Sequence, residues 1–147
     1  MLAALNAGTA NKKEILADSY LSYPKNLPEV MGSGALDALN VLHCSAAIEI
    51  EFSQGGTTKE VELVFENTIN THSFPRIFIT CKKGSKGTVI LNYQGSSENA
   101  SFSNVSSFVE VEENANLSIC TAFTLEKCCI YHSMAWFKLG STSNGVV

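Results

Sequence analysis

The chain of 147 residues has the length of about one domain, so a second full domain is not expected. Hydrophobic residues make up 45% and charged residues 16% of the sequence, a balance that provides a core and excludes an intrinsically disordered chain. The net charge of −4 and the scarcity of basic residues, with doublets only at Lys12-Lys13 and Lys82-Lys83, exclude a nucleic-acid-binding surface.

The N-terminal stretch MLAALNAGTANKKEIL lacks both a leading basic region and the continuous apolar run of a signal peptide. No run of about 18 apolar residues follows it. The five cysteines are an odd number without the spacing of a small secreted domain. We therefore expect a soluble cytoplasmic protein with reduced thiols and no membrane partner.

Residues 1–45 are predicted to form a helical or loop lead-in. The stretch NKKEILADSYLSY, residues 11–23, has apolar residues at helical spacing and predicts a short helix. Pro24 and Pro28 then break the chain. Residues 35–43, ALDALNVLH, predict a second short helix or a turn-rich entry segment; as a helix, its apolar face would carry Leu36, Leu39 and Leu42.

Residues 46–147 are predicted to form a mainly β body. In AIEIEF the apolar Ile48, Ile50 and Phe52 alternate with glutamates, as a strand with one buried face requires. Further strands are predicted where similar apolar runs follow, in EVELVF, RIFIT, GTVILNY, SFVEVE, NLSICTAF and CIYHSMAWF. No helical crossover separates these runs, so the body is expected to be all β.

A short phrase recurs in this body: ENASFS at residues 98–103 returns as ENANLS at residues 113–118. Gly84-Ser85 precedes the first copy by the same fifteen-residue step. We interpret the phrase as the corner of stacked coils, where Asn or Gly accepts a positive φ and Ala or Ser fits between crowded coils. The competing interpretations are a chance repeat in a Ser- and Asn-rich chain, or a sandwich or barrel.

The stretch FPRIFITCKKGSKGTVILNYQGSSENASFSNVSSFVEVEENANLSICTAFTLEKCCIYHSMA, residues 74–135, resembles the core of the SufB/SufD family. These proteins are scaffolds of the SUF system for iron–sulfur cluster assembly. Tyr131-His132, and the lack of a SufB-type cysteine motif, make the SufD type the better match. The other matching features are Pro75-Arg76, Gly84-Ser85, Tyr93, Gly95, Asn104 and VEVEENANLS at residues 109–118.

The resemblance implies a right-handed parallel β-helix that pairs with a SufB-like paralogue and works with the SufC ATPase. It implies a non-catalytic scaffold that binds no cofactor stably alone and meets iron or a cluster only transiently in the assembled complex. The family carries further coils and a C-terminal segment that engages SufC. No counterpart of these follows Val147, so we expect an incomplete β-helix without that docking segment.

The stretch C-C-x-x-H offers the candidate metal ligands Cys128, Cys129 and His132. Successive residues of a strand point to opposite faces, so Cys128 and Cys129 are not expected to hold one ion together. His132 is expected to be a hydrogen-bonded structural histidine, and Cys81 and Cys120 small buried residues. The pair His43-Cys44 could indicate an enzyme, but no oxyanion hole is evident and we predict no catalysis.

Trp136 and Phe137 indicate that the last coil exposes apolar surface at Val147, which a solenoid must cap or bury against a partner. We therefore expect association through the C-terminal coils, with a paralogue or as a homodimer. The alternative function is a β-solenoid or β-sandwich binding module with no metal role.

Overall fold

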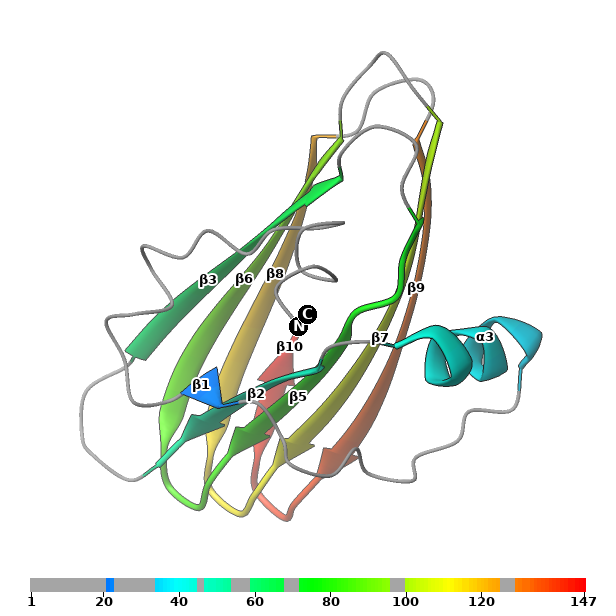
Figure 1. The fold of residues 1–147 in the computed structure, drawn as a ribbon. Coiled ribbons are helices and arrows are strands. Elements are labelled where there is room, and N and C mark those ends of the chain that lie inside the picture. The colour runs from blue at the N-terminus through cyan, green and yellow to red at the C-terminus, as the bar shows by residue number, and fades with distance from the viewer. Residues whose placement is uncertain are drawn as a thin grey trace.

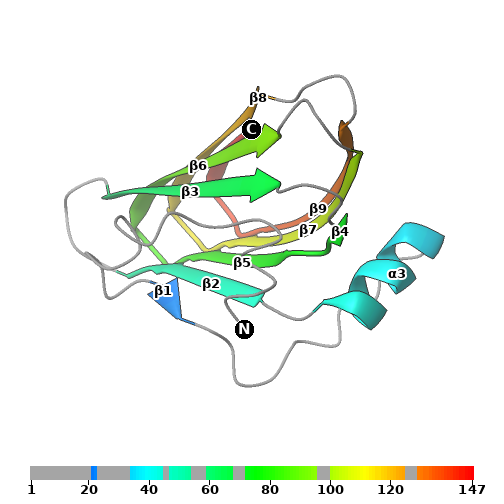
Figure 2. The ribbon, with the colours of Figure 1, turned by 45° about the horizontal axis from the view of Figure 1, so that its top comes forward.

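The computed structural model describes residues 21–22, 34–44, 47–53, 59–67, 72–95, 100–124 and 129–147. Within them the chain is mainly β and forms two sheets that face each other, with one short helix, α3 (Ala35–His43), outside them (Figures 1 and 2). The first sheet contains β1 (Leu21–Ser22), β2 (Ala47–Phe52), β4 (His72–Ser73), β5 (Arg76–Cys81), β7 (Ser101–Val111) and β9 (Cys129–Leu139). The second contains β3 (Lys59–Asn67), β6 (Lys86–Gly95), β8 (Asn116–Thr124) and β10 (Asn144–Val146).

From β2 onward the chain passes alternately through the two sheets, and all pairs between these strands are parallel. We call one long strand of each sheet, taken in sequence, a layer: β2–β3, β5–β6, β7–β8 and β9–β10. Ile48 pairs with Ile77, Ile77 with Ser107, and Ser107 with Ala135, so equivalent positions are 28 to 30 residues apart. The seven predicted strand segments of the body lie in strands of these layers, except that Glu112 of SFVEVE lies just past the end of β7.

The core fills the space between the sheets. Ile50 and Phe52 of β2, Leu63 of β3 and Val89 of β6 point inward and are fully buried. Because every second residue of these strands is apolar, one face of each sheet can be buried while the other carries polar groups. Burying each such side chain contributes about 1.5–3 kcal/mol.

The corners that join the first sheet to the second repeat from layer to layer. Gly84 has φ 70° and Asn114 has φ 57°, in the left-handed region that Gly and Asn tolerate best. Ser85 and Ala115 follow them and are buried. The N–H of Asn116 donates to the carbonyl of Ser85 at 2.9 Å, which stacks one corner on the next. The positive φ predicted for Gly84 and Asn114 is therefore confirmed.

The predicted period of these corners is wrong by a factor of two. Gly84 and Asn114 are equivalent and lie one full layer apart, so the fifteen-residue step corresponds to one strand and its turn, half of a layer. The other copy of the phrase begins at Asn99, which lies outside the described residues. Thr142, with φ 55°, is a corner that the sequence comparison missed.

Helix α3 forms where ALDALNVLH predicts it, but its orientation differs from the prediction. Asp37 and Asn40 are buried, whereas Leu36 and Leu42 are exposed, Leu42 at 76%. The face that packs on the sheet is polar because its partners there are polar. The helix predicted over residues 11–23 lies outside the described residues except for Leu21–Ser22, which form β1 and pair antiparallel with β2. No helix among the described residues is long and apolar enough to cross a membrane.

Candidate functional site

Strand β9 forms an open edge of the first sheet. It pairs with β7 along its whole length, and no other strand in the described part of the chain pairs with its second edge. In the second sheet β10 pairs only with Asn116–Ser118 of β8. An edge of this kind presents unpaired N–H and C=O groups and is ready to bind another strand. We call the side of the stack formed by β8, β9 and β10 the open end.

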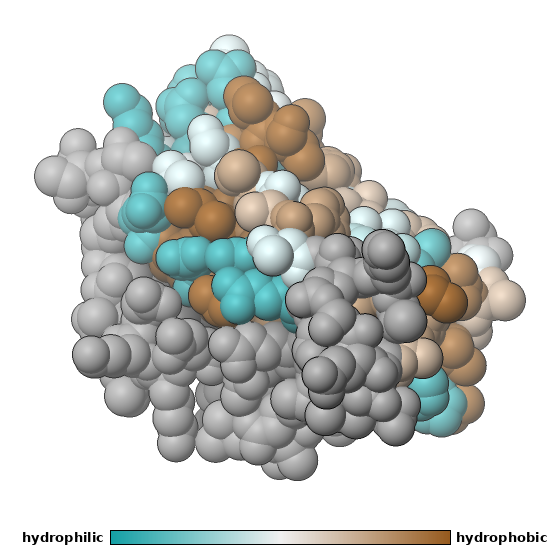
Figure 3. Space-filling model, turned by 90° about the horizontal axis from the view of Figure 1, so that it is seen from above, coloured by the Kyte–Doolittle hydropathy of each residue, from teal (hydrophilic) through white to brown (hydrophobic). Residues whose placement is uncertain are grey.

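Large apolar side chains are exposed at this open end. By register, Phe123 of β8 and Phe137 and Leu139 of β9 lie on the inward side of their strands, and Leu139 is 56% exposed. Ile130, on the outward side of β9, is 65% exposed. Figure 3, which looks at the molecule from above, shows a group of apolar residues, coloured brown, in its upper half. Exposed apolar surface of this kind is typical of an interaction site.

A cluster of aromatic rings leads from the core to the open end. The ring of Tyr93 stacks on Phe65 with centroids 4.8 Å apart and on Phe123 at 5.5 Å. Tyr131 of β9 contacts both Tyr93 and Phe123 at 4.7 Å, across the space between the sheets. Such ring pairs stabilise the stack by about 0.5–1.5 kcal/mol each beyond their buried area. The cluster therefore packs the inner surface of both sheets together at this end.

The structure separates the candidate metal ligands on β9. Cys129 lies on the inward side, where its sulfur accepts a hydrogen bond from the Ser101 hydroxyl at 3.2 Å. His132 lies on the outward side, where its Nδ1 is 3.0 Å from Oδ1 of Asn104, so it is the hydrogen-bonded histidine that the sequence predicts. Cys128 lies outside the described residues. Because Cys129 and His132 lie on opposite faces, β9 alone does not bring them to one ion. No group of three or more His, Cys, Asp or Glu side chains suited to a metal occurs within the described ranges.

A buried polar cluster attaches helix α3 to the outer face of the first sheet. Nδ2 of Asn40 donates to the carbonyl of Asn104 at 2.7 Å and to that of Pro75 at 3.3 Å. Nδ2 of Asn104 donates in return to the carbonyl of Leu36 at 2.6 Å. Asn104 thus links α3, β7 and, through His132, β9. The two amide groups and the three carbonyls satisfy one another, whereas Oδ1 of Asn40 is buried without a hydrogen-bond partner among the described residues. The cluster acts as a structural clamp.

Arg76 at the start of β5 is the buried cation of this face. Its guanidinium carbon lies 5.0 Å from the ring centroid of Phe108 and 5.6 Å from that of Phe78, a cation–π arrangement. Burial lowers the pKa of Arg76, while Cys44 and Asp37 oppose that shift. The Phe108 ring also stacks on Trp136 at 4.8 Å. Arg76 therefore interacts electrostatically with both ends of α3, with Asp37 in its first turn and with Cys44 at its C-cap.

The remaining predicted residues have ordinary surroundings. The His43 ring packs against Phe74 with centroids 5.2 Å apart. Cys81 is buried, as predicted, and its sulfur lies 3.1 Å from the Ser85 hydroxyl. Cys120 was also predicted to be buried, but it is exposed, because it faces outward from β8.

Sequence reasoning missed two features of this molecule. The clamp of Asn40 and Asn104 joins residues 64 positions apart, and nothing local marks either residue as its partner. The inward-facing hydroxyls near Tyr93 and Tyr131 were missed as well. Their signal was the alternation in LNYQG and CIYHSMAWF, which places both tyrosines on the buried side.

No protein-family model, no curated protein and no solved structure matches this chain.

Proposed function

We propose that this chain is a β-helical, SufD-like scaffold subunit that works in iron–sulfur cluster assembly without catalysing a reaction itself. Strands that alternate between two parallel sheets, with a step of 28 to 30 residues, support a β-helix. The family resemblance of residues 74–135, which include three of the four layers in whole or in part, supports the SUF assignment. In this proposal iron or a cluster is the cargo of the assembled complex.

The open end is the observation that carries a scaffold role. The unpaired edge of β9 and the exposed Phe123 and Leu139 are suited to a partner whose strands and apolar side chains continue the stack. A SufB-like paralogue, built from similar layers, has the matching shape. The SufC-like ATPase joins the complex in this proposal through segments other than the described layers.

A binding module without a metal role is the alternative. The observation that favours it is a pocket with several hydroxyl groups between the sheets, close to β9. A module of this kind would bind a ligand without affinity for SUF proteins.

Co-expression tests the scaffold proposal. The chain is produced with the SufB and SufC proteins of its own genome and analysed anaerobically by size-exclusion chromatography with light scattering. Co-elution with SufB supports the proposal and assigns pairing to these layers. Co-elution only of a version extended to the full reading frame supports the scaffold role but assigns docking to other segments. If neither version co-elutes, the proposal is wrong.

A further inference from the structure

A pocket lies between the two sheets near the open end. Its volume is about 120 Å³. Its walls come from five successive strands, β5 to β9, together with Val147. The pocket therefore belongs to the inner side of the stack, away from the outward-facing clamp of Asn40 and Asn104. None of the side chains that line it is charged, so a ligand in it would be neutral.

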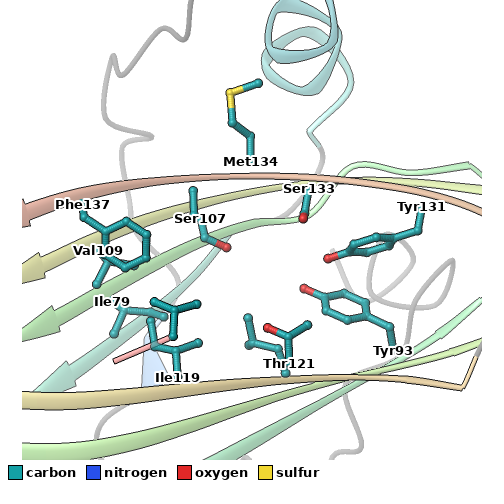
Figure 4. Close-up of a pocket in the computed structure, with 13 residues that line it drawn as sticks. Ile79, Tyr93, Ser107, Val109, Ile119, Thr121, Tyr131, Ser133, Met134 and Phe137 are labelled. Carbon is teal, nitrogen blue, oxygen red and sulfur yellow. The ribbon is translucent and has the colours of Figure 1, made fainter. Parts of the chain in front are cut away.

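The lining divides into an apolar end and a hydroxyl-bearing end (Figure 4). Ile79, Val109, Ile119 and Phe137 lie together at one end. The side chain of Met134 points away from the space, on the far side of its strand. At the other end the hydroxyl groups converge, from Tyr93, Tyr131, Ser107, Ser133 and Thr121.

Tyr93 provides an independent sign that a polar ligand belongs here. Its side chain is only 2% exposed, and the Tyr131 hydroxyl is the one hydrogen-bonding neighbour that its own hydroxyl has among the described residues, at imperfect geometry. The hydroxyl points toward that of Tyr131 across the pocket (Figure 4). Burial, and then the neighbouring Tyr131, raise the pKa of Tyr93 well above its usual value. Tyr93 therefore stays protonated and can donate to a ligand oxygen.

The size of the pocket limits the ligand. A cavity of about 150 Å³ with aliphatic and aromatic walls binds a benzene ring in a well-studied protein. A pocket of about 120 Å³ with an open side accepts a single ring of similar size. The aromatic rings of Tyr93, Tyr131 and Phe137 favour edge-to-face contacts with such a ring. A hydroxyl on the ring would reach the polar end.

We propose that this pocket binds a neutral, phenol-like group, whose ring packs between Ile79 and Phe137 and whose hydroxyl bonds to Tyr93. This site is independent of the proposed scaffold function, since it needs only the inner surface of this chain. The group can belong to a free small molecule or to a tyrosine side chain of a partner.

The test compares p-cresol with toluene, which differs from it only by the hydroxyl. Both are titrated into the purified chain and followed by NMR shifts of isoleucine and valine methyl groups. We expect shifts at Ile79, Val109 and Ile119, and about tenfold tighter binding of p-cresol than of toluene, since only p-cresol can add a hydrogen bond to the buried Tyr93 hydroxyl. Equal affinities, shifts elsewhere or no binding at millimolar concentrations would overturn the proposal.

Two variants and one control locate the interaction. Tyr93→Phe is expected to weaken p-cresol binding about tenfold and to leave toluene binding unchanged. Ala135→Phe, which fills the pocket from β9, is expected to abolish binding of both. Asn92→Ala, next to Tyr93 but on the outer face of β6, is the control and should bind as the wild type does. Unchanged p-cresol affinity in both Tyr93→Phe and Ala135→Phe would refute the site.

The two sources of the phenol group are separated by a further titration, in the complex with the SufB protein. Retained p-cresol binding indicates a free molecule as the ligand. Lost binding in the complex, with binding still present in the free chain, indicates that a partner side chain fills the pocket. The experiment on the free chain decides the pocket proposal whether or not this complex forms.

Discussion

Asn40 of helix α3 and Asn104 of strand β7 hold the helix on the sheet through reciprocal hydrogen bonds. The amide of Asn40 donates to the Asn104 carbonyl at 2.7 Å. The amide of Asn104 donates to the Leu36 carbonyl at 2.6 Å, and its side-chain oxygen lies 3.0 Å from Nδ1 of His132. Both asparagines are buried, so each bond is protected from competition with water.

Replacing Asn104 with alanine is predicted to lower the free energy of unfolding by about 2–4 kcal/mol. The substitution leaves the Leu36 carbonyl and the His132 ring without their partner at two partly buried hydrogen bonds, and a buried group left unpaired costs about 1–3 kcal/mol. Urea unfolding measures the loss. Asn92→Ala is the matched control, because Asn92 faces outward from β6 and its amide donates to Glu62 at 3.3 Å, at the partly exposed surface. Similar losses in both variants would argue against the clamp.

Gly87→Ala is predicted to destabilise the fold by about 1–3 kcal/mol through overpacking. A Cβ on Gly87 would lie 2.5 Å from the ring of Phe52, in the core between the sheets. Gly145→Ala is the control, since its Cβ would meet only Leu139 at an ordinary 3.5 Å. Thermal unfolding of the two variants decides the point. Equal melting temperatures would show that Phe52 moves away without cost.

The strands could be predicted from the sequence because their information is local. Alternation in AIEIEF fixes which residues of β2 are buried, and Gly84 and Asn114 mark corners that need a positive φ. The spacing between equivalent corners was predicted wrongly because the repeated phrase suits the turn at either end of a strand. Only the pairing of the strands reveals which copies stack on each other.

The polar side of α3 could not be predicted from its own sequence. Its leucines form an apolar face, and local periodicity therefore places that face on the core. In the structure Asp37 and Asn40 face the sheet, because their partners Arg76 and Asn104 lie there. Both partners are far from the helix in the sequence. The pocket was missed for the same reason, since its lining comes from five strands.

Cysteine reactivity is predicted to differ sharply between Cys120 and Cys81. Cys120 is exposed on the outer face of β8 and should react with iodoacetamide in the native protein. Burial raises the pKa of Cys81, whose sulfur also lies 3.1 Å from the Ser85 hydroxyl, so it should react only after unfolding. Peptide mass mapping after brief alkylation measures both sites. Equal labelling of the two thiols in native buffer would contradict their placement.

Glu112 is predicted to make stability depend on acid pH. Its carboxylate accepts a hydrogen bond from the backbone N–H of Lys83 at 2.9 Å and another from Lys82 at 3.0 Å, and these lower its pKa in that order. A carboxylate with a lower pKa in the folded state stabilises the fold above its unfolded pKa of about 4.3. That contribution is lost as the pH falls through the folded pKa.

Glu112→Gln should therefore melt below the wild type at about pH 6, and the difference should shrink toward about pH 2, where the wild-type carboxyl is also neutral. The effect is expected to be small, because the carboxylate is exposed and screened by solvent. Melting temperatures across the acid range, at low salt, measure it. A difference that stays constant over the whole range would show that the ionised form of Glu112 contributes nothing.

The open edge of β9 leads to a prediction about association. Because an unpaired strand with exposed apolar neighbours seeks a partner, the wild-type chain is expected to self-associate at micromolar concentration. Leu139 lies on the inward side of β9 and is 56% exposed, so Leu139→Lys places a charge at the edge with little cost to folding. This variant should lower the average mass measured by light scattering toward that of a monomer.

Lys138→Gln is the matched control for this experiment. Lys138 is the adjacent residue of β9 but points outward, where it pairs with Glu110 at 2.6 Å. Exposed pairs of this kind contribute little, so the control should associate as the wild type does. Circular dichroism confirms that both variants are folded. If the wild type is already a monodisperse monomer, or if both variants lose association equally, the inward apolar edge of β9 is not the surface that joins the molecules.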